Sequence, residues 1–521
     1  MKAIVFFWAL MFCFKSFSFT QFEIERGSQS TQACLLEILQ RLTQTDHSTD
    51  NWKANQLHEL SNLIKNNDFE IKEYPSGHKT YAEELKELSI KEGRPVTMDY
   101  FFDKYDFGQY KKYFKSDGTF DYFPEKPMKL AVENGDEKLQ FLRINIGHSS
   151  ERQSGILKSI GKIAEKMPGI EIGIVVPNHL VDWLKSHLDF FRKDVRKRIK
   201  IIPTSARKGI SLWAQDASKP VRRTIGDSRK TLVSDDGNRT NRQDLFDAIS
   251  EMDRQGISEK MQSMFKFEGG NVIVGERNVF VGPDIVANLA SRLSISRQDA
   301  ISALSKEFGK KVIDIGYPVK EGGLKQVDYH IDLSMAVARN KITGKEEVIL
   351  SSPYELFETV FGFSSVDKLT PDEFLKMKIK IINDLNDSIK KSNKILSPTD
   401  KELLLRIEDA TLEELKLTEA KSKSMEIILR KNGYDVKKIA GDYKESMNVD
   451  LPINLTNVIF SGNSVIVPKY NSFFLDKYVE TYFSELGYEV IPFESIHDTI
   501  TLKGGVRCIS ETYRCPIKEV D

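Results

Sequence analysis

The chain has 521 residues, of which 40% are hydrophobic and 29% are charged, a composition typical of a globular protein with a large buried core. Lysine plus arginine and aspartate plus glutamate both number 76, so the formal net charge is zero and nothing indicates binding to nucleic acid or to an anionic membrane surface. At about 100–200 residues per domain, this length predicts more than one folded unit.

The first residues predict a secretory signal peptide. Lys2 precedes an apolar run over residues 3–14, and Ser16, Ser18 and Thr20 follow it. Cleavage after Ser18 would leave a mature chain that is secreted or periplasmic. The run is shorter than the about 20 residues that span a bilayer, and no other stretch predicts a transmembrane helix. An uncleaved anchor is the alternative.

Removal of residues 1–18 would leave three cysteines, Cys34, Cys508 and Cys515. An odd number leaves at least one free thiol, even in a compartment that permits disulfides. A Cys34–Cys515 disulfide with a free Cys508, and an unpaired Cys34, both fit the sequence.

Residues 19–137 predict a mostly helical N-terminal extension. Apolar residues recur at helical spacing in residues 35–42 and 52–64. Residues 98–123 are dense in Tyr, Phe, Asp and Lys, and we interpret them as irregular or peripheral. No chemistry is indicated in this extension.

Residues 138–521 predict an α/β domain. Strands are expected at residues 141–146, 170–176 and 200–203, with a helix at 152–167.

One pattern of strand, tight turn, strand, helix and strand recurs further along the chain. It occupies residues 271–315 and again residues 457–491, and a third copy opens at residues 331–350. Repetition of one supersecondary unit favours a closed, radially repeated α/β architecture, in which turns and strand ends converge on a central site.

A charged stretch at about residues 367–419, rich in Lys, Glu, Leu and Ile, predicts a helical insertion. Pro371 and Pro398 are expected to break its helices. A helix at residues 421–429 and a strand at residues 434–436 would then complete the interrupted unit.

Four short stretches carry residues suited to chemistry on a cation. In the first, Trp213 and Asp216 could frame a cation with a ring face and a carboxylate, and a buried Trp with a capping Asp is the alternative. In the second, Glu268 precedes Gly269 and Gly270, which would let the backbone turn sharply and approach a ligand closely. An ordinary turn fits this second stretch equally well.

The third stretch, His330-Ile-Asp332, is predicted at a strand start, where alternation places both side chains on one face. Metal binding is the rival interpretation, but no His/Cys pair with zinc-like spacing accompanies it, so no metal site is predicted. In the fourth stretch, Cys508 follows a glycine-rich turn, and the adjacent Arg507 would lower the pKa of the thiol. A structural cysteine or a disulfide with Cys515 is the alternative.

Taken in order, Trp-x-x-Asp, Glu-Gly-Gly-Asn, His-x-Asp and Gly-Gly-x-x-Cys resemble the agmatine deiminase and peptidylarginine deiminase branch of the guanidine-modifying enzymes, the pentein superfamily. The resemblance covers about residues 138–516 and implies the pentein fold, a five-bladed α/β propeller of strand–strand–helix–strand units. It implies hydrolysis of the guanidinium of agmatine, arginine or peptidyl-arginine to a ureido product and ammonia, without a cofactor. An amidinotransferase with the same thiol intermediate and a non-catalytic guanidine-binding protein are the alternatives.

The resemblance also implies a role for each motif residue. Cys508 would attack the guanidinium carbon, His330 would act as acid and then as base, and Glu268 would orient His330. The guanidinium of the substrate would be bound by three residues, Asp216, Asp332 and Trp213.

Three positions depart from the residues usual in that family. Gln215 replaces Arg, Lys219 replaces Gly, and Arg507 replaces His. These departures concern the choice of substrate rather than the reaction.

Overall fold

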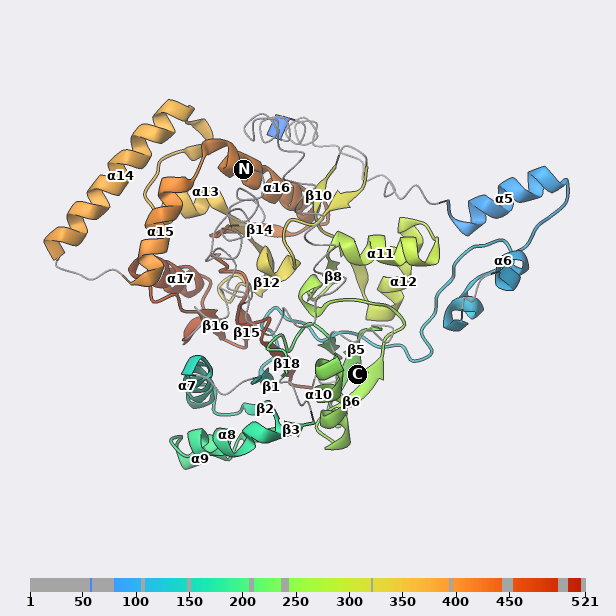
Figure 1. Cartoon of the computed structure of the whole chain (residues 1–521), viewed down its shortest axis with the longest axis horizontal. Coiled ribbons are helices and arrows are strands. Elements are labelled where there is room, and N and C mark those ends of the chain that lie inside the picture. The colour runs from blue at the N-terminus through green and yellow to red at the C-terminus, as the bar shows by residue number, and fades with distance from the viewer. Residues whose placement is uncertain are drawn as a thin grey trace, which may run out of the picture. The chain divides into compact units, whose positions relative to one another are not determined.

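The computed structural model describes residues 57–58, 79–104, 108–147, 151–205, 210–235, 243–319, 322–392, 397–442, 453–494 and 505–516. The chain divides into two compact units, Met1–His58 and Glu59–Asp521, and the features below belong to the second unit (Figure 1). The predicted signal peptide and Cys34 lie outside the described residues, so both stay predictions. No helix in the described part of the chain is long and apolar enough to cross a membrane.

Within the described residues, five sheets share one pattern of strand pairing. In each, a central strand pairs antiparallel with one neighbour and parallel with another. Four of these sheets use strands consecutive in sequence: β4 (Ser218–Pro220), β5 (Lys230–Val233) and β6 (Glu259–Gln262); β7 (Val272–Val274), β8 (Asn278–Val281) and β9 (Lys311–Asp314); β12 (Met335–Arg339), β13 (Glu346–Ser352) and β14 (Asp435–Ala440); β15 (Ile459–Ser461), β16 (Ser464–Pro468) and β17 (Glu489–Phe493). The predicted repeat is confirmed, and the β4–β6 copy is one that the sequence did not reveal.

The fifth of these sheets joins segments from opposite ends of the unit. β1 (Leu139–Asn145) pairs parallel with β2 (Glu171–Pro177) and antiparallel with β18 (Ser510–Arg514), and β3 (Ile199–Thr204) lies beyond β2. Cys508 comes directly before β18, so the pairing of β18 with β1 determines where the thiol lies.

Helices connect the parallel strands of each sheet. In the sheet of β18, β1, β2 and β3 they are α7 (Glu151–Lys166), α8 (Val181–Leu188) and α9 (Lys193–Arg196). In the other four sheets they are α10 (Gln243–Arg254), α11 (Pro283–Leu293) with α12 (Arg297–Phe308), α16 (Leu412–Lys431), and α17 (Phe473–Glu485). The ends of α12 show why the sequence forms a helix there: the Ser296 side chain accepts a hydrogen bond from the N–H of Asp299, and Gly309 ends the helix with φ 70°.

The segment predicted as an insertion is helical. It contains α14 (Pro371–Ser392) and α15 (Pro398–Asp409), and α16 begins within it. Pro371 and Pro398 begin these helices rather than break them, because proline fits the first helical position, where its missing N–H would have no partner. Short elements complete the unit: α13 (Pro353–Glu355), η6 (Leu356–Val360), η7 (Val366–Lys368), η2 (Asn178–Leu180), β10 (Tyr317–Pro318) and β11 (Leu324–Lys325).

The described part of the N-terminal extension contains α5 (Tyr81–Glu92), α6 (Asp99–Lys104) and η1 (Gly108–Tyr113). The interpretation of residues 98–123 as peripheral is wrong. Phe101 and Tyr113 are buried in one hydrophobic cluster with Phe265 and Phe308. Asp103, Lys104, Lys111 and Lys112, which lie between Phe101 and Tyr113, are exposed, so composition alone suggested a surface segment. The domain boundary near residue 137 stays a prediction.

Candidate active site

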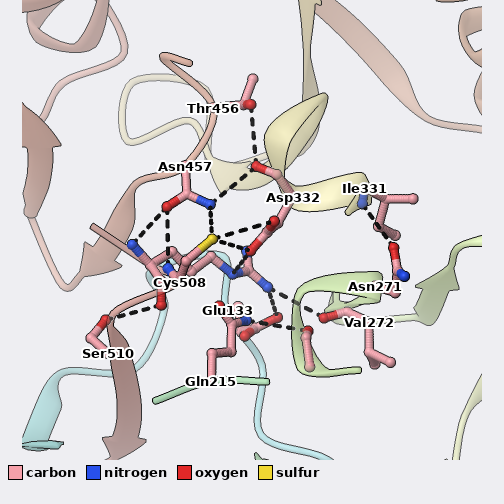
Figure 2. Close-up of polar contacts among 12 residues, drawn as sticks. Glu133, Gln215, Asn271, Val272, Ile331, Asp332, Thr456, Asn457, Cys508 and Ser510 are labelled. Carbon is pink, nitrogen blue, oxygen red and sulfur yellow. Dashed lines mark hydrogen bonds and ion pairs between the residues drawn. The ribbon is translucent and has the colours of Figure 1, made fainter. Parts of the chain in front are cut away.

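Cys508 lies in a turn before β18, and only 3% of its surface is exposed. Its Sγ atom is 3.8 and 3.9 Å from the two carboxylate oxygens of Asp332 and 3.2 Å from Nδ2 of Asn457 (Figure 2). Cys508 and Cys515 are both free thiols, so the alternative of a disulfide between them is wrong.

His330 and Asp332 reach the thiol from a turn. His330 has extended backbone angles, Ile331–Leu333 form the 3₁₀ helix η5, and β12 begins only at Met335. The predicted strand start is therefore wrong, but the expected convergence occurs. A ring nitrogen of His330, a carboxylate oxygen of Asp332 and the sulfur of Cys508 all lie within 4.8 Å of one another.

Glu268 pairs with the imidazole of His330, with 2.8 Å between Oε2 and Nε2. A Cβ atom at Gly270 would lie 2.3 Å from His330 Nδ1, and one at Gly269 would lie 2.0 Å from the carbonyl oxygen of Gln215. These two glycines therefore make room for protein neighbours, the imidazole ring and the Gln215 backbone.

Asp216 lies on a loop that is hydrogen-bonded to the turn after Glu268 and to Cys508. Its carbonyl oxygen accepts a hydrogen bond from the N–H of Gly269 at 3.0 Å, and the N–H of Gln215 donates to the carbonyl of Cys508 at 3.3 Å. The Asp216 side chain is buried, and its negative charge acts on both His330 and Cys508.

Five of the six predicted site residues thus come together. The sixth, Trp213, is partly buried against the large hydrophobic core, and its carbonyl oxygen accepts a hydrogen bond from the N–H of Asp216 at 3.2 Å. A contact of the Trp213 ring with substrate stays a prediction.

The electrostatic setting of the thiol differs from the one expected. Burial raises the pKa of Cys508 well above its ordinary value, and the charges of Asp332 and Asp216 raise it further. The expectation that Arg507 lowers this pKa is wrong. The Arg507 guanidinium is directed instead at Glu133, with 2.6 Å between Nη2 and Oε2, and at Asp332, with 3.6 Å between Nε and Oδ2.

The surroundings of His330 favour its charged form, whereas those of Cys508 favour the neutral thiol. Burial by itself would lower the pKa of His330, but the hydrogen bond to Glu268 and the charges of Asp216, Asp332 and Glu268 outweigh it, so the pKa is raised. His330 therefore keeps its proton to higher pH than a free histidine, which suits donation to a departing amine.

Asn457 is a site residue that the sequence analysis missed. Its Oδ1 atom accepts hydrogen bonds from the N–H groups of Arg507 at 2.8 Å and Cys508 at 3.3 Å. Since an amide oxygen is needed there, the NH₂ group must face the sulfur. A Cβ atom at Gly505 would lie 2.5 Å from this Oδ1, so a glycine is required beside it.

The internal repeat held the signal for Asn457. Asn457-Val-Ile opens one copy of the repeat, and Asn271-Val-Ile opens another. Oδ1 of Asn271 accepts a hydrogen bond from the N–H of Ile331, next to His330, at 3.1 Å (Figure 2). Equivalent asparagines of two repeat units thus hold the main chain beside the thiol and beside the imidazole.

A second missed feature is a pair of buried ion pairs centred on Glu133. Its Oε1 atom lies 3.0 Å from Lys219 Nζ and its Oε2 atom 2.6 Å from Arg507 Nη2. Lys219 and Arg507 are two of the three positions at which the sequence departs from the residues usual in the deiminases it resembles. No sequence pattern indicated that they share a partner, because Glu133 lies in the predicted extension.

His330, Asp332 and Cys508 offer nitrogen, oxygen and sulfur donors that a divalent ion such as Zn²⁺ accepts. Three such ligands are too few for a closed structural zinc site, which has four, but they match the number in a catalytic zinc site. The expected absence of a metal therefore stays a prediction.

No protein-family model matches the chain, and a comparison with curated proteins found no match. Solved structures do resemble it. Agmatine deiminase from C. jejuni with substrate bound is 14% identical, with a TM-score of 0.47 over 76% of this chain and 100% of that one. Agmatine deiminase of Enterococcus faecalis is 12% identical, with a TM-score of 0.45 over 76% of this chain and 100% of that one.

DDAH from Pseudomonas aeruginosa is 12% identical, with a TM-score of 0.34 over 72% of this chain and 100% of that one. At these identities and scores, the case for a function depends on the geometry of the site.

Proposed function

We propose that this protein is a hydrolase of guanidino groups, a deiminase that converts the guanidinium of agmatine, arginine or peptidyl-arginine into a ureido group and ammonia. One observation carries the proposal: the buried thiol of Cys508 lies near two buried carboxylates and near a hydrogen-bonded imidazole–carboxylate pair. The two carboxylates are those of Asp216 and Asp332, and the pair is His330 with Glu268. Two buried carboxylates favour a planar cation with several N–H donors, and guanidinium is such a cation.

The proposed reaction uses four of these groups in turn. Asp216 and Asp332 bind the guanidinium, and the thiolate of Cys508 attacks its central carbon, forming a C–S bond. Protonated His330 gives its proton to the departing nitrogen, the C–N bond breaks, and ammonia leaves. Neutral His330 then takes a proton from water, and the hydroxide attacks the carbon. The C–S bond breaks to regenerate the thiolate, and the added hydroxyl group loses its proton to solvent, which leaves the ureido carbonyl.

The raised pKa of Cys508 implies that substrate binding activates the thiol. In the free protein, burial and the charges of Asp332 and Asp216 oppose thiolate formation. A bound guanidinium cancels the carboxylate charges and places a cation beside the sulfur. The thiol therefore loses its proton to solvent as the substrate binds.

The test is ammonia release from a panel of arginine, agmatine and arginine peptides. Cys508→Ala should abolish release, and Cys515→Ala is the matched control, since it removes the other described thiol and should leave the rate unchanged. If the wild type releases no ammonia from any guanidine compound, the deiminase proposal is wrong.

An amidinotransferase would form the same adduct but would pass the amidino group to an amine. Product analysis with an added primary amine separates the two reactions, since only the transferase yields a new guanidine.

The proposal extends to the fold and to the location of the protein. We infer that the five sheets are blades of a closed five-bladed propeller, which the shared connectivity and the pairing of β18 with β1 support. We also propose export through the signal at residues 1–18. Amino-terminal sequencing of the protein recovered outside the cytoplasm should then begin at Phe19.

A further inference from the structure

Four buried charged side chains form a row that ends at the thiol: Lys219, Glu133, Arg507 and Asp332. Their side chains are 1%, 11%, 7% and 0% exposed. The charges alternate along the row, with separations of 3.0, 2.6 and 3.6 Å between neighbouring N and O atoms. The last member, Asp332, is the carboxylate that faces Cys508.

Two hydrogen bonds join the row to the main chain of β7. The N–H of Val274 donates to Glu133 Oε2 at 2.8 Å, and Arg507 Nη2 donates to the carbonyl of Val272 at 3.4 Å. Glu133 and Val272 both appear beside the thiol in Figure 2. The strand that follows Glu268 therefore helps to place the row.

The contact at the Asp332 end is an ion pair rather than a hydrogen bond. The separation is 3.6 Å, and Nε of Arg507 has no hydrogen-bond partner among the described residues. Arg507 thus acts on Asp332 through its charge and leaves the carboxylate oxygens able to accept N–H groups from a ligand.

Arg507 is the neighbouring cation that most strongly favours the ionised form of Asp332. Burial raises the pKa of Asp332, and Arg507 opposes this effect most strongly, followed by His330 and Lys219, whereas Glu133 adds to it. A protonated Asp332 would not attract a cation.

We propose that Arg507, held in place by Glu133 and Lys219, is a positioning residue that keeps Asp332 ionised and oriented to receive the guanidinium of the substrate. This role rests on the proposed function for the identity of the substrate. The binding of any small amidinium cation beside the thiol is enough to test it.

The first experiment compares two alkylating reagents on a Cys515→Ala background, where Cys508 is the described thiol that remains. Chloroacetamidine carries a planar cation, and chloroacetamide is its neutral counterpart. The ratio of their rates reports how well the site binds the cation, independently of turnover. Arg507→Gln should lower this ratio about tenfold or more, the loss expected for one charge-assisted contact, and Arg507→Lys should recover part of it. An unchanged ratio in a folded Arg507→Gln protein would overturn the proposal.

The second experiment separates positioning from stability. In Arg507→Gln the KM for a guanidino substrate should rise by about tenfold or more, with a smaller change in kcat. A fall in kcat with an unchanged KM would show that Arg507 only stabilises the fold, and would contradict the proposal.

The third experiment tests the row as one unit. Glu133→Gln leaves two cations with one anion, whereas the double variant Lys219→Met/Glu133→Gln leaves the balanced Arg507–Asp332 pair. The double variant should melt at a higher temperature than Glu133→Gln and should recover the rate ratio to within a few-fold of the parent. A double variant no better than Glu133→Gln would contradict coupling along the row.

The two proposals fail separately. A parent protein that releases no ammonia, but whose high rate ratio falls in Arg507→Gln, would contradict the deiminase function and would support the role of Arg507. A parent protein that releases ammonia, with a rate ratio unchanged by Arg507→Gln, would support the deiminase function and would contradict the role of Arg507.

Discussion

The side-chain amide of Asn457 donates a hydrogen bond to the sulfur of Cys508 across 3.2 Å, and a carboxylate oxygen of Asp332 lies 3.8 Å from the same sulfur. Burial and carboxylates oppose the thiolate, while this hydrogen bond favours it. The amide cannot rotate freely, because its oxygen is engaged by the N–H groups of Arg507 and Cys508.

We therefore predict that Asn457→Asp, which keeps the size and one acceptor oxygen but loses the donor, lowers kcat about 10²–10³-fold, as for the loss of one donor to a developing anion. Alkylation of Cys508 should also need higher pH. Asn463→Asp, an exposed position in the same hairpin, is the control and should behave as the wild type. Equal alkylation rates in the two variants at every pH would contradict this role.

The raised pKa of His330 predicts the alkaline limb of the pH–rate profile. The protonated imidazole is lost as pH rises through this pKa, so activity should fall there. Glu268→Gln removes the strongest contribution that raises the pKa, and the limb should move to lower pH. Glu276→Gln, an exposed carboxylate, is the control. A limb that stays in place in Glu268→Gln would show that His330 is not the group that titrates.

The same pKa shift predicts a dependence of stability on pH. A histidine whose pKa is raised on folding contributes stability that is fully present below its unfolded pKa and is lost as pH rises through the folded pKa. The difference in free energy of unfolding between the wild type and His330→Gln should therefore shrink as pH rises through that range. Urea denaturation at several pH values measures it, and a constant difference would contradict the prediction.

Lys219 predicts a dependence of the opposite sign. Burial lowers the pKa of Lys219 to about 8, with the charge of Glu133 opposing the shift and that of Arg507 adding to it. Between this pKa and the ordinary value of 10.5, the unfolded chain holds more protons than the folded one, so the free energy of unfolding rises with pH.

Lys219→Met should remove this rise, which amounts to roughly 3 kcal/mol at most at ~1.4 kcal/mol per pKa unit. Denaturation of the wild type and the variant at pH 7 and pH 10 measures the change. Lys197→Met, at an exposed lysine, is the control. The same stability difference at both pH values would count against a buried ammonium group.

A buried ion pair supports the loop that carries Asp216. Arg143 Nη1 lies 3.1 Å from Glu511 Oε2, and both side chains are 0% exposed. Arg143 also donates to the carbonyl of Ala214, and Ser218 Oγ donates to Glu511 Oε1 at 2.6 Å. The pair therefore holds the loop on both sides of Asp216.

We predict that Glu511→Gln destabilises the protein by roughly 3–5 kcal/mol, because it leaves the Arg143 charge buried without a counter-ion. Arg143→Met/Glu511→Gln should recover part of this loss. Urea denaturation of the wild type, the two single variants and the double variant gives these values, and strict additivity of the two substitutions would contradict the coupling.

The local pattern of the sequence was enough to predict several elements. The helix expected at residues 297–308 is α12 (Arg297–Phe308), because a capping serine precedes it and a glycine follows it. The hairpin expected at residues 457–467 is β15 and β16, because two apolar runs enclose a tight turn. The short helix η5 was missed, since three residues are too few to show a period.

In the candidate site, too, some residues could be predicted from the sequence and others could not. The motif residues could be named from the sequence because their types and order form a recognisable set. The partners of Glu133 could not, since Lys219 and Arg507 lie 86 and 374 positions away and no local pattern links them. The direction of the Cys508 pKa was missed for a related reason: neighbours in sequence suggested Arg507, whereas neighbours in space include Asp332 and Asp216.

The pairing of β18 with β1 also has a consequence for biosynthesis. The ribosome makes β1 long before Cys508 and β18. A nascent or truncated chain that stops short of Ser510 has β1 as an unpaired sheet edge, a surface prone to join strands of other chains. Aggregation should therefore be the characteristic failure of incomplete chains, and Cys508 can take its place beside Asp332 only after β18 has left the ribosome and paired with β1.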